Sequence, residues 1–405
     1  MIAVDSMAAG LVKLPMMASD RKQTGAERAP MRMLLVWDLP IRVFHWLLVL
    51  CVATALITGF LAPEWWKGVH AVAGYGTVLL LVFRLIWGVF GGEYSRIASF
   101  VYSPRRTLEH LRGLLMLRPP HYMGHNPSGA AMIFALMAVL IALTTTGLIE
   151  LGGEEKQGPL AGIVGYALGN GLKPVHRALA IVLIAMVTLH ILGVAVEIAI
   201  TRAPLIRAMI TGWKPLPAGE PVPEPRSARP RAAAVALALV ALPAAVVLGE
   251  LSRLPPTGIP TLPANDLYAE ECGACHAPFH PSLLPRSSWA GVMAGLSDHF
   301  GQDASLPHDE VQRIGAYLQT YAAEAWDTEA ARRFAVIAAD EPLRITATPY
   351  WRKKHARLDA AVFSRPAIGT RSNCSACHQD AATGRFDDQA IHIPGDKAHA
   401  SQTVD

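Results

Sequence analysis

Five long apolar stretches dominate the pattern of hydrophobic and polar positions along the chain. They occupy residues 43–62, 69–90, 129–149, 175–200 and 232–251. A helix needs about 20 apolar residues to cross a bilayer, so the simplest prediction is five transmembrane helices. The fifth stretch is rich in alanine and contains Pro243, which leaves an interfacial helix as the alternative for it.

The pattern changes after the fifth stretch. Residues 252–405 show few strand-like alternations and several short helical patterns. In residues 310–321, for example, apolar side chains recur at helical spacing, and Pro307 and Asp309 supply a helix start just before them. We therefore expect an all-α protein, in which a helical membrane bundle is joined to a loop-rich helical domain.

Composition supports a membrane protein, because 52% of the 405 residues are hydrophobic and only 17% are charged. The formal net charge is +4. Arginine and lysine cluster in a few loops and do not form one basic face, which argues against a nucleic-acid partner. The charge is instead informative about membrane topology.

The two basic loops define the expected orientation. Residues 91–128 and 201–231 carry many arginines, whereas residues 150–173 contain several glutamates. Loops rich in Lys and Arg stay on the cytoplasmic side, so the amino terminus is expected inside. A fifth crossing then carries residues 252–405 to the periplasmic side of a bacterial inner membrane.

These patterns divide the chain into five parts. Residues 1–33 form an N-terminal tail without the apolar core of a signal peptide. Residues 34–214 form a four-helix unit, residues 215–231 a proline-rich cytoplasmic linker, residues 232–251 the fifth helix and residues 252–405 the periplasmic domain.

Four of the five cysteines fall in two copies of one motif. The copies are Cys272-Gly-Ala-Cys275-His276 and Cys374-Ser-Ala-Cys377-His378. In Cys-x-x-Cys-His, two thiols attach a haem covalently and the adjacent histidine ligates its iron. The motifs predict two c haems, and such attachment occurs outside the cytoplasm. The alternative, a zinc site made from both cysteine pairs, gives the histidines no role.

The spacing of residues alone does not identify the second axial ligand of each c-haem iron. The candidates in this domain are Met293 and six further histidines, namely His280, His299, His308, His355, His392 and His399.

Four further histidines lie in the apolar stretches, where histidine is costly and marks a cofactor or a proton path. His176 and His190 are fourteen residues apart, so they share one helix face and differ in depth by about 21 Å. His70 with His176 would bracket an outer haem b, and His45 with His190 an inner one. A proton relay is the alternative.

Two other residues of the membrane unit are candidates. Arg84 lies fourteen residues after His70, at the level of the inner haem, where it would pair with a propionate or reach the cytoplasmic interface. His125 lies in a Gly-His-Asn-Pro turn, which suits either a quinone site or helix initiation by Asn-Pro.

The membrane unit resembles a bacterial dihaem cytochrome b family that includes the b-type cytochrome subunit of nickel–iron hydrogenases. The resemblance covers residues 34–214 and rests on Trp-Asp-Leu-Pro-Ile-Arg-Val-Phe-His-Trp (37–46), Arg-Leu-Ile-Trp-Gly (84–88) and Gly-His-Asn-Pro-Ser-Gly-Ala (124–130). It implies haem-ligand positions at His45, His70, His176 and His190.

Residues 264–394 resemble the bacterial dihaem cytochrome c family, whose irons usually have two histidine ligands. The similar segments are Ser-Trp-Ala-Gly-Val-Met-Ala-Gly-Leu-Ser-Asp-His-Phe-Gly (288–301) and Thr-Pro-Tyr-Trp-Arg-Lys-Lys-His (348–355). The resemblance implies His299 and His355 as distal ligands, with His276 and His378 proximal, and leaves their pairing open. The remaining four histidines of the domain are expected at the surface.

Two b haems and two c haems in series predict transmembrane electron transfer in a respiratory chain, between the quinone pool and a periplasmic electron carrier. Whether the chain is itself an enzyme, of the quinol:cytochrome oxidoreductase type, stays open. One alternative is an oxidoreductase that acts on oxygen, superoxide or a metal ion at an under-ligated c haem. Another is a haem-bearing anchor subunit of a larger enzyme. The small residues Gly74 and Gly76 would allow close packing against a second copy of the chain, so a homo-oligomer is a further alternative.

Overall fold

A computed structural model describes residues 32–120, 122–216 and 226–395. Most of the expected N-terminal tail and of the proline-rich linker lies outside the described residues. Within them the regular secondary structure is almost entirely helical, as the sequence predicts.

Five helices are long and apolar enough to cross a membrane, which confirms the count from the sequence. They are α1 (Leu39–Phe60), α2 (Lys67–Phe90), α4 (Pro127–Gly153), α5 (Tyr166–Thr201) and α7 (Pro230–Arg253). Helix α5 begins nine residues before the predicted span and continues through Pro174, and α7 continues through Pro243. The outward faces of these helices expose large apolar side chains, as lipid contact requires.

Side-chain caps define where two of these helices begin. Asp38 accepts a hydrogen bond from the backbone N–H of Ile41 at 3.1 Å, and a proline follows in the first turn of α1. Asn126 accepts from Gly129 N–H at 2.7 Å at the start of α4, again followed by proline. Such caps satisfy N–H groups that the helix leaves unpaired.

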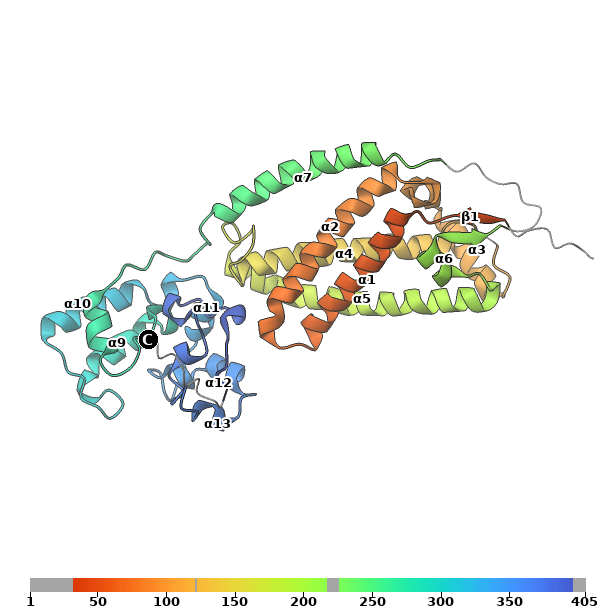
Figure 1. Cartoon of the computed structure of the whole chain (residues 1–405). Helices are drawn as coiled ribbons and strands as arrows, with labels where there is room; N and C mark the ends of the chain where they lie inside the picture. The colour runs from red at the N-terminus through yellow and green to blue at the C-terminus, as the bar shows by residue number, and fades with distance from the viewer. Residues whose placement is uncertain (1–31, 121, 217–225, 396–405) are drawn as a thin grey trace, which may run out of the picture.

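One end of the bundle holds a small sheet that the hydrophobic pattern does not predict. Strands β1 (Met33–Leu35) and β2 (Trp213–Pro215) pair antiparallel, with Leu34 opposite Lys214. Helices α3 (Pro104–Leu115) and α6 (Leu205–Thr211) lie at the same end (Figure 1). The described parts of both basic loops therefore lie at one end of the bundle.

The C-terminal domain, residues 254–395, lies at the opposite end of the bundle, and α7 runs beside α2 to reach it (Figure 1). Its helices are α8 (Asp266–Gly273), α9 (Arg286–Ala294), α10 (His308–Thr320), α11 (Glu329–Phe334), α12 (Pro349–His355) and α13 (Ala360–Phe363). Helix α10 confirms the helix predicted over residues 310–321, and Pro307 is its N-cap.

Short 3-10 helices connect the longer elements. They are η1 (Glu64–Trp66), η2 (Glu93–Ser95), η3 (Ile97–Phe100), η4 (Pro281–Leu283), η5 (Leu296–Asp298), η6 (Ala323–Ala325), η7 (Ile345–Ala347), η8 (Cys374–Ala376), η9 (Ala381–Thr383) and η10 (Asp388–Ala390).

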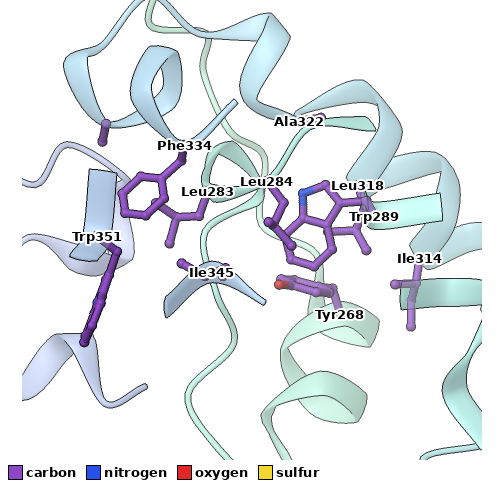
Figure 2. Packing of buried hydrophobic residues seen from close by; sticks show 11 residues of the cluster. Tyr268, Leu283, Leu284, Trp289, Ile314, Leu318, Ala322, Phe334, Ile345 and Trp351 are labelled. Atoms are coloured by element: carbon purple, nitrogen blue, oxygen red, sulfur yellow. The ribbon is translucent and has the colours of Figure 1, made fainter. Parts of the chain in front are cut away.

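The larger of two apolar clusters in the C-terminal domain is shown in Figure 2. Trp289 packs in it beside Leu284 and Tyr268, and its indole N–H donates to the carbonyl of Pro281 at 2.7 Å. Trp351 and Phe334 extend the cluster towards α12. This core holds together the loops that carry both Cys-x-x-Cys-His motifs.

Candidate functional site

His70 on α2 and His176 on α5 face each other inside the membrane bundle. Their ring centroids are 6.1 Å apart, with an angle of 72° between the ring planes. Both rings line a cavity of about 430 Å³ whose walls are largely apolar, with Leu140 and Leu143 among the lining residues. The structure thus brings together the two histidines that the topology argument paired.

A threonine on the neighbouring helix holds each of these rings. Thr58 Oγ1 lies 3.1 Å from His70 Nδ1, and Thr146 Oγ1 lies 3.0 Å from His176 Nδ1. Each hydroxyl donates its own proton to a carbonyl one helical turn earlier, so its oxygen accepts from the imidazole N–H. The carbonyl of Ala55 accepts from His70 Nδ1 as well, at 3.0 Å. Nε2 of each ring is therefore the nitrogen left for a metal.

The residue after each threonine is a glycine, and each glycine makes room for the ring. A Cβ atom at Gly59 would lie 3.3 Å from His70 Cε1, and one at Gly147 would lie 3.1 Å from His176 Cε1. Sequence reasoning missed these two Thr-Gly pairs. Their repetition in two helices was a signal that could have found them.

His45 on α1 and His190 on α5 form the second histidine set of the bundle. The two imidazoles are close enough to interact electrostatically. His45 Nδ1 is buried and has no hydrogen-bond partner within the described residues. A buried polar atom of this kind calls for a further group beside it.

Arg84 is buried near the other end of α2, and its Nη1 donates to the carbonyl of Ser95 at 3.0 Å. The guanidinium also lies 5.6 Å from the ring centroid of Phe100. The side chain thus points into the segment after α2 and does not extend to the surface. Its predicted contact with a haem propionate stays a prediction.

His125 is partly buried and packs between the rings of Trp37 and Phe100, each with its centroid 4.5 Å away. Burial, together with the charges of Arg84 and Lys214, lowers the pKa of His125 to about 3. The next residue, Asn126, caps α4, which accounts for the Asn-Pro part of the motif by helix initiation.

The first Cys-x-x-Cys-His motif lies at the end of α8. His276 and His299 face each other with ring centroids 6.4 Å apart and nearly parallel planes, at 24°. The carbonyl of Ala277 accepts from His276 Nδ1 at 2.9 Å. Burial, with a smaller effect of His276, lowers the pKa of His299. A neutral imidazole is the form that binds a metal.

The second motif contains η8 and brings His378 to His355, the last residue of α12. Their ring centroids are 6.2 Å apart, at 69°. His355 stacks on Trp351 and its Nδ1 donates to the Trp351 carbonyl at 2.9 Å. Burial, together with the neighbouring His355, lowers the pKa of His378 to about 4.

The three ring separations fit one iron between two imidazoles. A metal–nitrogen bond of about 2 Å, with the ring centroid roughly 1 Å beyond each nitrogen, puts two axial imidazole centroids about 6 Å apart. The separations of 6.1, 6.2 and 6.4 Å match this arrangement. In the C-terminal domain the structure thus places His276 next to His299 and His378 next to His355.

The cysteines of the two motifs do not converge. All five described cysteines are free, and the three-residue ligand cluster found among the described residues contains no cysteine. Burial, with a smaller effect of Glu271, raises the pKa of the Cys272 thiol to about 11. These observations do not fit the four-thiolate zinc alternative.

The remaining histidines of the C-terminal domain correct one expectation. His280 is buried, not at the surface: its ring packs edge-on against Trp326 and its Nδ1 lies 2.8 Å from Ser282 Oγ. Its neighbours form a tight local turn, which a spacing argument does not reveal. His308 and His392 are exposed as predicted, and His399 lies outside the described residues.

Ion pairs connect the C-terminal domain to the end of the bundle that carries His70 and His176. Lys67, one turn before His70 on α2, lies 2.5 Å from both Glu155 and Asp388. Lys354 lies 2.7 Å from Glu64. Asp388 and Lys354 come from the C-terminal domain, yet both line the 430 Å³ cavity. Sequence reasoning gave no sign of these contacts.

A second group of contacts lies farther along the same boundary. Lys156 is buried and pairs with Asp327 at 3.1 Å, and the backbone N–H of Tyr166 donates to the same carboxylate at 2.7 Å. Arg333 donates to Asn170 at 2.9 Å. Together the two groups hold the domain against the loops that follow α1 and α4.

Two family models match the chain. The model for prokaryotic cytochrome b561 matches residues 36–212, and the model for dihaem cytochrome c matches residues 268–386. The cytochrome b561 match covers α1 to α6, and the dihaem cytochrome c match covers both Cys-x-x-Cys-His motifs.

Curated relatives of the membrane bundle are named as b-type cytochrome subunits of Ni/Fe-hydrogenases, all with the qualifier "probable". One from Escherichia coli is 28% identical over 135 residues, which is 28% of this chain and 57% of the relative's length. One from Azotobacter chroococcum is 24% identical over 209 residues, covering 44% of this chain and 87% of the relative.

Solved structures match the C-terminal domain. A dihaem cytochrome c from Rhodobacter sphaeroides is 37% identical, covers 30% of this chain and 97% of its own, and has a TM-score of 0.27. One from Shewanella baltica is 34% identical, with 33% and 95% covered and a TM-score of 0.27. By the two family models, the membrane bundle is a cytochrome b561-type domain and the C-terminal domain is a dihaem cytochrome c domain.

Proposed function

We propose that the chain transfers electrons between the membrane quinone pool and a soluble redox partner in the periplasm, through two b haems and two c haems. The two family matches already imply haem-mediated electron transfer in a membrane. The haems supply reversible one-electron iron chemistry when bound. Our proposal goes beyond the family matches in three respects, namely the number of haems, the quinone and the periplasmic partner.

Three of the haem sites follow from the ring pairs, and the fourth, at His45 and His190, follows from the topology of the bundle. His70 and His176 hold the outer haem b, and His45 and His190 the inner one. His276 and His299 hold the c haem attached to Cys272 and Cys275, and His378 and His355 hold the haem attached to the second motif. The single observation that best supports this assignment is the similar separation of three independent histidine pairs.

A haem held by both histidines of such a pair would have no position left for a substrate, which favours electron transfer over small-molecule chemistry. The basic loops and the C-terminal domain lie at opposite ends of the bundle. This arrangement supports an inner-membrane topology with a periplasmic C-terminal domain.

Reconstitution in liposomes tests the proposal. Added quinol is expected to reduce both b-type and c-type absorption bands, and an oxidised soluble electron acceptor outside the vesicles is expected to reoxidise them. Vesicles that bind quinol without any haem reduction would contradict the proposal.

The names of the curated relatives favour one second candidate, a haem-bearing subunit of a larger respiratory enzyme. Isolation of the chain from its native membrane by a mild affinity step distinguishes the two. Co-purification of a stoichiometric catalytic subunit would favour the second candidate, and a chain that purifies alone with full quinol activity would favour the first.

A further inference from the structure

Three glutamate side chains from two domains meet at the boundary between the bundle and the C-terminal domain. Glu154 and Glu155 follow the last turn of α4, and Glu329 is the first residue of α11. One oxygen from each carboxyl group lies within 4.8 Å of those from the other two. Three carboxylates this close repel one another, so their charge requires compensation.

Glu154 shows that the existing contacts leave this group of side chains incomplete. Its side chain is 0% exposed, and one of its oxygens, Oε1, accepts from Lys173 Nζ at 2.6 Å. The other oxygen, Oε2, has no hydrogen-bond partner within the described residues. Buried carboxylate oxygens are normally paired, because an unpaired one loses its hydration without replacement. Lys173 therefore satisfies only one side of this carboxylate.

A small cavity of about 20 Å³ lies between these side chains. Oxygen-bearing side chains line it, namely those of Glu154, Glu155, Glu329, Thr328 and Asp387, and Lys156, Arg385 and Phe386 complete the lining. A cavity of this size holds one water-sized sphere. We name it the triglutamate pocket.

Three basic side chains nearby have partners outside the three carboxyl groups. Lys156 also borders the pocket, but its Nζ donates to Asp327 at 3.1 Å. Arg385 donates to the backbone carbonyls of Glu155 and Lys156. Lys67 is shared between Glu155 and a second carboxylate.

We propose that the triglutamate pocket binds one Ca²⁺ ion, which joins the membrane bundle to the C-terminal domain. Carboxylate and carbonyl oxygens are the ligands of hard cations, and Ca²⁺ accepts about six to eight of them in irregular geometry. Mg²⁺ requires near-octahedral geometry and gives up its waters reluctantly, which suits a pocket of rigid protein ligands less well. The affinity expected is that of extracellular modules, on the order of 10⁻⁴–10⁻³ M.

The ion would cross-link the two domains, because both of them supply its ligands. The site does not depend on the haem assignment. Its occupancy can therefore be measured whatever the electron-transfer route proves to be.

Isothermal titration calorimetry tests the proposal. The full-length, haem-loaded, detergent-solubilised protein is first treated with a chelator to remove bound cations. CaCl₂ alone is the probe, and MgCl₂ is titrated in parallel. The wild type is expected to bind one Ca²⁺ per chain, more tightly than Mg²⁺, and Ca²⁺ is expected to raise its Tm. Glu329→Gln is expected to abolish both effects.

Glu270 is an exposed glutamate on α8, and the Glu270→Gln variant is the matched control. This variant is expected to bind Ca²⁺ like the wild type. Glu329→Asp keeps the charge and is expected to bind Ca²⁺ more weakly than the wild type, so it replaces the Gln variant if that variant does not fold. Wild-type protein that binds no Ca²⁺ would overturn the proposal, as would wild-type affinity in either Glu329 variant.

Discussion

Lys354 Nζ lies 2.7 Å from Glu64 Oε2, and this ion pair joins the residue before His355 to the turn before α2, the helix that carries His70. Lys354 also lines the cavity between His70 and His176. The His355–His378 pair is thus linked through its sequence neighbour to the outer histidine pair of the bundle. This link suggests the order in which electrons cross the boundary, with the second Cys-x-x-Cys-His motif next to the bundle.

Replacement of Lys354 by glutamine tests the importance of this link. The variant loses the ion pair with Glu64 and the weaker one with Asp388, at 3.9 Å. We expect unchanged haem content and slower reduction of the c-type band after quinol is mixed with the protein in a stopped-flow experiment. Lys353→Gln, at the exposed neighbouring lysine, is the control and is expected to reduce at the wild-type rate. Equal rates in both variants would show that the link does not limit transfer.

Thr146→Val tests the hydrogen bond that orients His176. Valine keeps the shape of threonine and removes the oxygen that accepts from Nδ1. Loss of such a contact typically weakens metal binding about 10–100-fold, so we expect partial loss of haem b on purification and a shifted reduction potential. Thr188→Val, at an exposed threonine that also donates to its own helix, should change neither. Full haem b retention at an unaltered potential in Thr146→Val would refute the assigned role.

His299→Ala and His355→Ala test the pairing in the C-terminal domain. Each variant is expected to convert one of the two c haems to a high-spin form that binds carbon monoxide, because each removes one axial ligand. Absorption spectra with and without carbon monoxide measure this. His308→Ala, which removes an exposed histidine, should leave both c haems low-spin. A variant at 299 or 355 that stays entirely low-spin would identify a different ligand at that haem.

His280 predicts a pH dependence of stability. Burial lowers its pKa to about 4, below the ordinary value of 6.5, so the folded state binds fewer protons there than the unfolded state. This stability is fully present above pH 6.5 and is lost as the pH falls towards 4. The difference corresponds to about 3 kcal/mol.

Urea unfolding of the full-length protein between pH 7 and 4, followed by Trp fluorescence, measures this effect. His280→Asn keeps an acceptor for Ser282 N–H and removes the titrating ring. Its stability is expected to fall less steeply with acid than that of the wild type, and His308→Asn is expected to follow the wild type. Parallel curves for His280→Asn and wild type would rule out this origin of the pH dependence.

Helical periodicity made the membrane part largely predictable. The fourteen-residue spacing of His176 and His190 places them on one face of their helix. Because His70 and His176 both lie at the outer ends of their helices, the topology pairs them, as observed. The periodicity could not show that Thr58 and Thr146 accept hydrogen bonds from these rings. That contact depends on the rotation of each helix about its axis, which interhelical packing determines.

The loop-rich domain was less predictable for a physical reason. His299 follows a 3-10 turn that places it beside His276, and His355 contacts His378 from a separate segment. No periodic sequence pattern predicts either contact. The family resemblance supplied these candidates, and the fold supplied their pairing. The burial of His280 and the ion pairs of Lys67 depend on contacts between distant parts of the chain, which local sequence does not encode.

The most direct test of the central claim is a pyridine haemochrome spectrum of the purified full-length protein, which distinguishes b from c haems and counts each per chain. Four histidine pairs predict two b haems and two c haems. A chain with two c haems and no b haem would be a dihaem cytochrome c on an inert membrane anchor. That result would contradict the proposed roles of His45, His70, His176 and His190.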